Sequence, residues 1–374
     1  MQRLPISEID TYFVNGNYPI EFLFYYKNAL NTTAIRKALR RLTTAFWPLF
    51  GLYENGAIIA QNYREDDYFS ETKYENTFEA GGDAMALWER YKDVNPAEMH
   101  GLFFLHVLQF KNGTALVPKM NHLVGDGYSY FYFLAVLAAM AQNSFVPFKK
   151  FAIRHLAMPK LNRTPLQPFQ FRNQKIQQSL IYENFRIVNE TVAKADVASA
   201  LDHLNGEHNA RVSVNDYLSA MVFQKTYQAQ KARHTGQFTL SIPMDVRRYV
   251  PQLGAKFFGN GLQFHRLTLE RAALNTIATE DLALKIRKSV PVVDSSMYTQ
   301  YLADLEVKIS KSEEHALLPY DPATGCLVTN LTRMPLPKLD FGGGAPSLSF
   351  PLTTGKNSAA VFADGDNFLL RLVY

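Results

Sequence analysis

The segment from Asn121 to Gly127, in which His122 and Asp126 stand four positions apart, is the strongest candidate for a site of chemistry in this chain. A strand-like run, residues 115–120, ends just before His122, and Gly125 and Gly127 then allow the backbone to turn sharply. A histidine at a strand end can act as a general base in a cleft, because its ordinary pKa lies near neutral pH. The same residues also fit a histidine that is hydrogen-bonded into a domain interface, so the motif alone leaves both interpretations open.

The strands and helices around this motif must position the imidazole of His122. Residues 102–110 and 115–120 have the alternation of the two strands of a hairpin. Residues 128–142 are apolar nearly all round, which is typical of a buried helix. Two further predicted elements lie upstream: an amphipathic helix over residues 33–46 and a short strand over residues 57–61.

Strands and helices alternate in both halves of the chain, which predicts an α/β fold built in layers. In the second half, the predicted strands cover residues 180–188, 238–242, 263–269, 325–331, 347–350, 358–362 and 368–373. The predicted helices there cover residues 190–204, 215–231, 280–288 and 295–309.

A proline-bearing stretch without a core face interrupts this alternation at residues 159–174. We therefore expect an N-terminal domain over residues 1–160, a crossover linker over residues 161–178 and a C-terminal domain over residues 179–374. Two domains also agree with the length of 374 residues, which is more than one hydrophobic core usually supports.

The composition is that of a globular protein and argues against several partners. Hydrophobic residues make up 47% of the chain and charged residues 20%, so disorder is not expected over most of its length. The net charge of +5 is modest, and no block of lysine and arginine exceeds two residues. We therefore expect no nucleic-acid partner.

The chain has one cysteine, Cys326, so no internal disulfide can form. A single cysteine and the histidine spacing also give no pattern of metal ligands, and no metal is expected. The N-terminal residues lack an apolar signal core, and the longest apolar stretch, residues 128–140, is too short to span a bilayer. The expected location is the cytoplasm.

An ordered set of motifs resembles the BAHD acyltransferases, within the wider chloramphenicol acetyltransferase-like superfamily. The motif His-x-x-x-Asp-Gly is His122 to Gly127, and the late Asp-Phe-Gly-x-Gly motif stands at residues 340–344. Between and before them lie further landmarks, which are residues 6–10, 46–51, 212–220, 245–248 and the pair Gly259-Asn260. The set spans nearly the whole chain.

The resemblance implies two chloramphenicol acetyltransferase-like α/β domains, each with a mixed sheet flanked by helices, and a channel between them. Acyl-CoA would enter as a co-substrate, a small-molecule alcohol or amine would be the acceptor, and no cofactor would be bound permanently. His122 would act as the general base while the acceptor attacks the thioester directly. The protein would be a monomer.

The resemblance also implies roles for other residues. Thr329, eleven residues before Asp340, would donate a hydrogen bond to the tetrahedral intermediate. Asp126 would point away from the substrate, pair with Arg247 of the second domain and, with Gly127, support the loop that carries His122. A structural turn remote from the reacting atoms would be formed by Asp340, Phe341, Gly342 and Gly344.

The chain departs from the family pattern at three positions. Gly343 and Leu331 stand where tryptophan is frequent, and Asn121 stands where many carrier-protein condensation domains have a histidine. Two alternatives to an enzyme that uses free CoA also remain open from the sequence, although Asn121 argues against the first of them. One is a condensation-type acyltransferase that takes its acyl group from a carrier protein, and the other is a non-catalytic small-molecule binder with the same fold.

Overall fold

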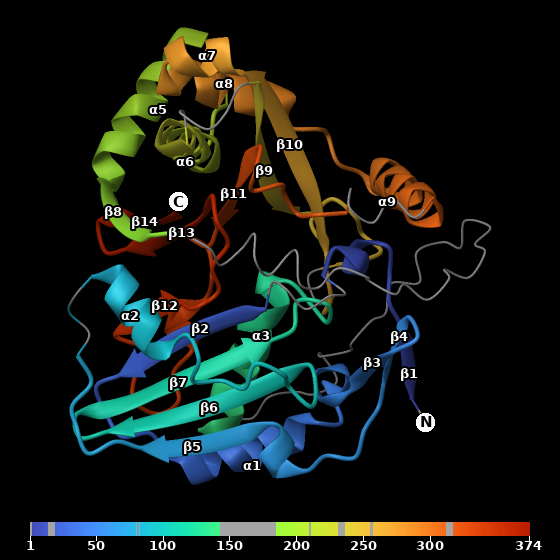
Figure 1. The fold of residues 1–374 in the computed structure, drawn as a ribbon, viewed down its shortest axis with the longest axis vertical. Helices are drawn as coiled ribbons and strands as arrows, with labels where there is room; N and C mark the ends of the chain where they lie inside the picture. Colours follow the sequence, from blue (N-terminus) through green and yellow to red (C-terminus); the bar gives the residue numbers. More distant parts are fainter. Residues whose placement is uncertain are drawn as a thin grey trace.

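The described residues form two large β-sheets, with helices packed beside each (Figure 1). The computed structural model describes residues 2–13, 19–79, 81, 83–142, 185–208, 211–230, 236–254, 257–311 and 317–374. The alternation of strands and helices predicted from the sequence is therefore present as an α/β fold.

The first sheet has five strands in the order β12-β2-β7-β6-β5. Its strands are β2 (Ile20–Tyr26), β5 (Phe69–Lys73), β6 (Phe103–Phe110), β7 (Gly113–Met120) and β12 (Leu348–Pro351). Only the pair β5 and β6 is parallel among these neighbours. The edge strand β12 comes from the C-terminal part of the chain, where Leu348 pairs with Tyr25 of β2. The two halves of the sequence therefore share this sheet.

The second sheet has six strands in the order β10-β9-β11-β13-β14-β8. Its strands are β8 (Ile187–Ala193), β9 (Gln237–Asp245), β10 (Leu262–Glu270), β11 (Gly325–Asn330), β13 (Ser358–Asp364) and β14 (Asn367–Val373). The central strand β11 runs parallel to both neighbours, and the other pairs are antiparallel, so this sheet is also mixed.

A small third sheet lies near the N-terminus. Its strands are β1 (Arg3–Pro5), β3 (Leu52–Glu54) and β4 (Ala57–Ile59), in the order β1-β4-β3. Asn55 and Gly56 connect β3 to β4 with positive φ angles of 49° and 75°. Asparagine and glycine adopt this left-handed conformation more easily than other residues, which explains the tight hairpin.

The helices follow the alternation. They are α1 (Thr32–Leu42), α2 (Ala84–Tyr91), α3 (Gly127–Ala141), α5 (Lys194–His208), α6 (Val214–Gln230), α7 (Arg271–Thr276), α8 (Thr279–Ser289) and α9 (Ser295–Ser310). Short 3-10 helices are η1 (Ile9–Phe13), η2 (Trp47–Phe50), η3 (Glu65–Asp67) and η6 (Leu336–Lys338). In Figure 1, α5 to α8 gather beside the six-stranded sheet, and α1 and α3 lie beside the five-stranded sheet.

Helix α3 is the centre of the largest hydrophobic core. Phe131 and Phe133 of α3 are almost fully buried and pack with Leu39 of α1. The same core takes in Phe258 and Leu331 from the C-terminal part of the chain. The element that follows His122 is therefore held by apolar contacts from both halves, and burial of such side chains stabilises the fold by about 1.5–3 kcal/mol each.

Several local predictions are confirmed. The predicted hairpin over residues 102–110 and 115–120 is β6 and β7, and the predicted helix over residues 128–142 is α3. The strands predicted over residues 358–362 and 368–373 are β13 and β14, which pair along their whole length as the final hairpin.

The helix predicted over residues 190–204 is wrong at its beginning. Residues up to Ala193 belong to β8, and the helix α5 starts only at Lys194. Strand β8 pairs with β14 from Ile187 to Ala193, so pairing with a distant strand overrides the local preference of these residues. The predicted linker over residues 161–178 lies outside the described residues.

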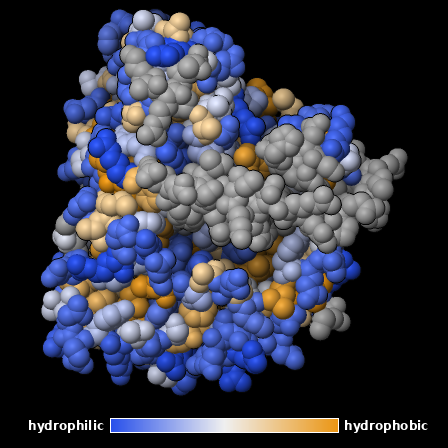
Figure 2. Space-filling model, in the orientation of Figure 1, coloured by the Kyte–Doolittle hydropathy of each residue, from blue (hydrophilic) through white to orange (hydrophobic). Residues whose placement is uncertain are grey.

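The surface is largely polar on the face drawn in Figure 2, with hydrophobic side chains in small separate groups. Across the part of the chain that the structure describes, the helices are all too short or too polar to cross a membrane.

Candidate active site

A cavity of about 260 Å³ lies between the two large sheets. Its lining includes Ile20 and Phe22 of β2 and, on the other side, Leu327 of β11 and Ala360 of β13. The candidate site residues His122, Asp126, Gly127, Arg247 and Thr329 also line it. The cavity thus brings together residues that are far apart in the sequence.

His122 follows the end of β7 and is held by neighbours on two sides. The ring of Phe13 stacks on the imidazole, with the two ring centroids 3.7 Å apart and an angle of 17° between the planes. The side chain of Asn121 accepts a hydrogen bond from the backbone N–H of Leu123 at 3.0 Å, which fixes the turn just after the histidine. Both the ring plane and the backbone of His122 are therefore restrained.

The side chain of Asn260 determines which nitrogen of His122 carries a proton. Its Nδ2 lies 2.8 Å from the carboxylate of Asp10 and 2.9 Å from the backbone carbonyl of His122, both of which only accept hydrogen bonds. This end of the amide must therefore be the NH₂ group. The opposite Oδ1 lies 3.1 Å from His122 Nδ1, which must then be the donor. It follows that Nδ1 carries the proton and Nε2 is free to accept one.

The environment also keeps the imidazole neutral. Burial lowers the pKa of His122 to about 4, although Asp126 and the hydrogen bond with Asn260 act in the opposite direction. At neutral pH the ring therefore has an unprotonated Nε2 ready to take a proton.

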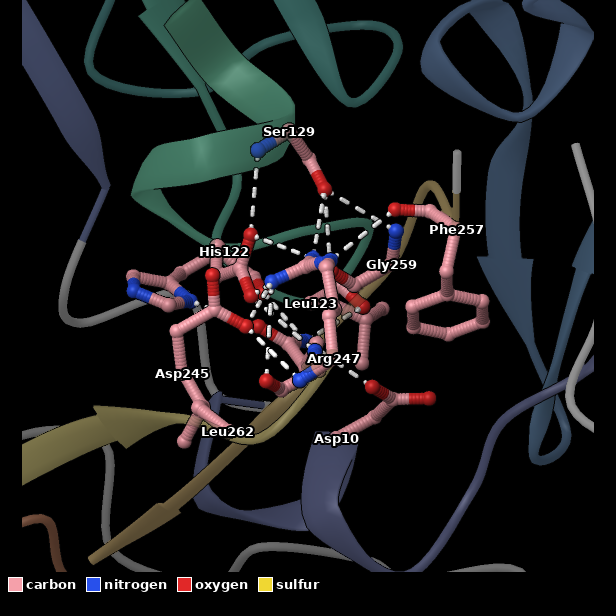
Figure 3. A network of polar contacts seen from close by, with 12 residues as sticks. Asp10, His122, Leu123, Ser129, Asp245, Arg247, Phe257, Gly259 and Leu262 are labelled. Atoms are coloured by element: carbon pink, nitrogen blue, oxygen red, sulfur yellow. Dashed lines mark hydrogen bonds and ion pairs between the residues drawn. The ribbon is translucent and has the colours of Figure 1, made fainter. Parts of the chain in front are cut away.

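Asp126 forms a buried ion pair with Arg247, the partner that the resemblance implies. Figure 3 shows Arg247 within the polar network that also holds Ser129 and Gly259. The distance from Arg247 Nη2 to Asp126 Oδ2 is 2.8 Å, and both side chains are almost fully buried. Asp126 is also the N-cap of α3, where it accepts from the N–H of Ser129 at 3.0 Å, and it accepts from the N–H of Gly261 at 3.0 Å. One carboxylate thus joins three segments of chain.

Arg247 satisfies the rest of its guanidinium within the same network. It donates to the backbone carbonyls of Phe257 at 3.1 Å and Gly259 at 2.9 Å, and its guanidinium lies over the ring of Tyr128 at 4.6 Å. Asp245 accepts a weaker bond from Arg247 Nη1 at 3.2 Å. These bonds hold the turn at residues 257–261 beside the loop of His122, which is the turn that carries Asn260.

Thr329 lies on β11 with its side chain at the cavity, on the opposite sheet from the strand that precedes His122. Its hydroxyl makes no hydrogen bond to any of the residues described by the structure. A free hydroxyl at the cavity can donate to a ligand.

The late motif forms a turn away from the cavity. Asp340 Oδ1 accepts from the backbone N–H groups of Gly342 at 2.8 Å and Gly344 at 2.9 Å, and both glycines have positive φ angles, 99° and 81°. Phe341 packs edge-on against Tyr26 in the core. None of these motif residues lines the cavity.

Sequence reasoning missed the neighbours that orient His122. Residues 6–10 and Gly259-Asn260 were recognisable only as landmarks, and nothing in their spacing connects Asp10, Phe13 or Asn260 with a histidine more than a hundred positions away. Their roles follow from tertiary contacts alone. No group of three or more histidine, cysteine, aspartate or glutamate side chains suitable for a metal occurs within the described ranges.

The ion pair gives a direct test of how the site is held. We expect Asp126→Ala to lower the free energy of unfolding by about 3–5 kcal/mol, because it leaves the buried Arg247 charge without its main partner. Asp245→Ala is the matched control. Its carboxylate also contacts Arg247 but is 48% exposed, so its loss should cost about 0–1 kcal/mol. Denaturant unfolding of both variants measures the difference, and equal losses would contradict this account.

Comparison with solved structures shows that other proteins have the same fold. TRI101 of F. sporotrichioides complexed with coenzyme A and T-2 is similar at a TM-score of 0.76 and 13% identity, over 99% of this chain and 94% of that chain. Vinorine synthase is similar at a TM-score of 0.74 and 17% identity, over 100% of this chain and 90% of that chain. For TRI101 of F. graminearum complexed with coenzyme A and deoxynivalenol the TM-score is 0.75 at 12% identity, over 100% and 95% of the two chains.

These similarities confirm the predicted fold class, a chloramphenicol acetyltransferase-like arrangement of two α/β domains. A sequence comparison with curated proteins found no match. The family model described as "Transferase family" matches residues 86–367. Because this match covers well over half of the sequence, the chain belongs to the Transferase family of BAHD acyltransferases and is itself an acyltransferase.

Proposed function

We propose that this acyltransferase moves an acyl group from a CoA thioester directly to the hydroxyl or amine of a small-molecule acceptor, with His122 as the general base. The observation that carries the proposal is the contact between Asn260 and His122, which leaves Nε2 of a neutral imidazole unprotonated. The complexes of TRI101 with coenzyme A support acyl-CoA as the co-substrate.

The proton follows a closed path in this mechanism. His122 Nε2 removes the proton of the acceptor as its oxygen or nitrogen attacks the thioester carbonyl carbon. The tetrahedral intermediate then collapses, the carbon–sulfur bond breaks, and the same proton passes from Nε2 to the CoA thiolate. His122 returns to its starting state, so no acyl-enzyme intermediate and no second base are needed.

Thr329 is proposed to stabilise the charge that develops during this step. Its hydroxyl lines the cavity on the sheet opposite β7 and is free of hydrogen bonds to the described residues, so it can donate to the developing oxyanion. Asp126, Gly127 and Arg247 are proposed to support the site without taking part in the chemistry, because Asp126 and Arg247 are occupied by each other and by the backbone. Gly127 begins α3 directly after them.

Release of free thiol is the first test. We expect purified protein to release CoA thiol from at least one donor among acetyl-, malonyl-, longer-chain and aromatic acyl-CoA, but only when an alcohol or amine acceptor is present. His122→Ala should lower the rate by about 10²–10⁴ because the general base is lost. His106→Gln is the matched control, since His106 is a half-buried histidine on β6 outside the cavity.

A wild-type protein that is inactive with every free CoA donor would contradict this proposal. Activity that returns with an acyl group on a phosphopantetheinylated carrier protein would replace CoA by a carrier as the donor. Acceptor-independent release that survives in His122→Ala would remove His122 from the chemistry.

The low pKa of His122 sets the pH dependence. The neutral imidazole is the reactive form, and its pKa lies at about 4, so kcat/KM for an alcohol acceptor should stay level from about pH 8 to about pH 5. An ordinary histidine would already lose activity below about pH 6.5. Phe13→Ala should admit water to the ring of His122. The pH below which kcat/KM falls should then move up towards about 6.5. A wild-type limb near 6.5 would contradict the buried neutral base.

Replacing the Thr329 hydroxyl tests the oxyanion donor. We expect Thr329→Val, which keeps the shape of the side chain, to lower kcat by about 10²–10³ with little effect on the melting temperature. Thr268→Val on the exposed surface of β10 is the control. A change confined to KM would show that Thr329 binds substrate equally in the ground state and the transition state.

A further inference from the structure

Arg371 on β14 is a buried cation for which no acidic side chain of the described residues supplies a counter-charge. Only 3% of the residue is exposed. Its Nε and Nη2 are buried and have no hydrogen-bond partner among the described residues, and its one recorded contact is with the ring of Phe350, 5.2 Å from the guanidinium. Buried charges are normally paired, because an uncompensated charge away from water is strongly unfavourable. An arginine in this state therefore needs an explanation.

Arg371 is among the residues that line the same cavity as His122 and Thr329. Its neighbours in the strand, Leu370 and Leu372, point into the core beneath the sheet, so Arg371 points to the opposite face, towards the first sheet. Arg371 is thus part of the lining of the candidate active site.

A second polar group at this wall is also unsatisfied. Thr354, in the segment between β12 and β13, is 2% exposed and lines the cavity, and its hydroxyl oxygen is buried without a partner among the described residues. Arg371, which can donate several hydrogen bonds, and Thr354, which can donate one, therefore line the same cavity. Both would be satisfied by one acceptor with two or more oxygen atoms.

The register of the sheet places this wall relative to Thr329. Thr329 of β11 pairs with Ala360 of β13, and Ala360 pairs with Arg371 of β14. The three residues form one row across the sheet with their side chains on the same face, so the α-carbons of Thr329 and Arg371 are roughly 10 Å apart, two strand spacings. The small side chain of Ala360 between them leaves room for part of a substrate.

The two aspartates and two arginines of the cavity lining sum to zero, but both aspartates contact Arg247, so the distribution of charge favours a single negative charge at Arg371. The other arginine of the lining, Arg247, already has Asp126 and Asp245 as partners. Burial lowers the pKa of Arg371 to about 9, so it still carries its charge at neutral pH. One uncompensated positive charge matches a carboxylate, whereas a phosphate dianion would require more cations than this wall offers.

We propose that Arg371 and Thr354 bind a carboxylate on one of the two substrates, so that the enzyme selects a dicarboxylic acyl donor or a carboxylate-bearing acceptor. The proposal rests on the proposed function, since it concerns the same cavity. The planar guanidinium would hold the carboxylate in a two-pronged pair, with the Thr354 hydroxyl as a third donor. Arg371 is then a specificity-determining residue that takes no part in proton transfer.

Melting temperatures test the site without any turnover. The probes are glutarate and benzoate, and the uncharged glutaramide and benzamide are their controls. They are added to the wild-type protein, Arg371→Met, Thr354→Val and Arg41→Met. Arg41 is an exposed arginine on α1, so Arg41→Met is the control variant. We expect ligand-free Arg371→Met to melt about 2 °C or more above the wild type, because methionine removes the unpaired charge and keeps much of the volume. The carboxylates should raise the melting temperature of the wild type and of Arg41→Met, and leave that of Arg371→Met unchanged.

Kinetics then identify which substrate carries the carboxylate. One arm compares succinyl-CoA with butyryl-CoA, and the other compares 4-hydroxyphenylacetate with its primary amide as acceptors. In one of the two arms, the one whose acid binds at Arg371, the ratio of kcat/KM for the acid over its uncharged analogue should fall about ten- to a hundred-fold in Arg371→Met. Arg41→Met should keep the wild-type ratio.

Two results separate this inference from the proposed function. If the wild type shows no shift with the carboxylates, Arg371→Met melts lower and the ratios stay unchanged, then Arg371 is a structural residue stacked on Phe350 and the inference is overturned. If no donor releases thiol from the wild type, but carboxylates still stabilise it and not Arg371→Met, the anion site is supported and the transfer reaction fails alone.

Discussion

The buried pair of Asp126 and Arg247 is the interaction on which the site depends. Asp126 caps α3 and bonds to Gly261, while Arg247 bonds to the carbonyls of Phe257 and Gly259. A buried ion pair loses hydration, and it is stable only when the remaining donors and acceptors are also bonded, as they are here. The pair thereby fixes the turn of Asn260 against the loop of His122, so a contact away from the imidazole sets the position of the proposed base.

This arrangement explains why an amide, and not a carboxylate, faces the histidine. Asp126 is only four residues from His122, yet its oxygens are taken by Arg247 and by backbone N–H groups. The amide of Asn260 orients the ring without adding a negative charge, so burial keeps the pKa of His122 low. A weak base suits a thioester, which is already activated and needs only an oriented acceptor and removal of one proton.

Local sequence patterns predicted many of the helices and strands and part of the candidate site. The turn after His122, the hairpin before it and α3 behind it depend on neighbours within about thirty residues, and patterning finds such elements. Contacts across the sheets are different in kind. Strand β12 joins β2 from more than three hundred positions away, and the residues that hold the imidazole, Phe13 and Asn260, reach it only through that packing. The same long-range pairing made a strand of residues predicted as helix at β8.

The two arginines of the cavity show how partners decide the role of a residue. Arg247 is surrounded by acceptors from its own chain, so its charge contributes to architecture and no ligand is needed. Arg371 is as deeply buried, but its guanidinium has the ring of Phe350 beside it and no ion-pair partner among the described residues. An unpaired buried cation makes the ligand-free protein less stable, and an anion that binds beside it removes this unfavourable free energy. Selectivity would then come from the cost of leaving Arg371 unpaired, which a neutral substrate cannot relieve.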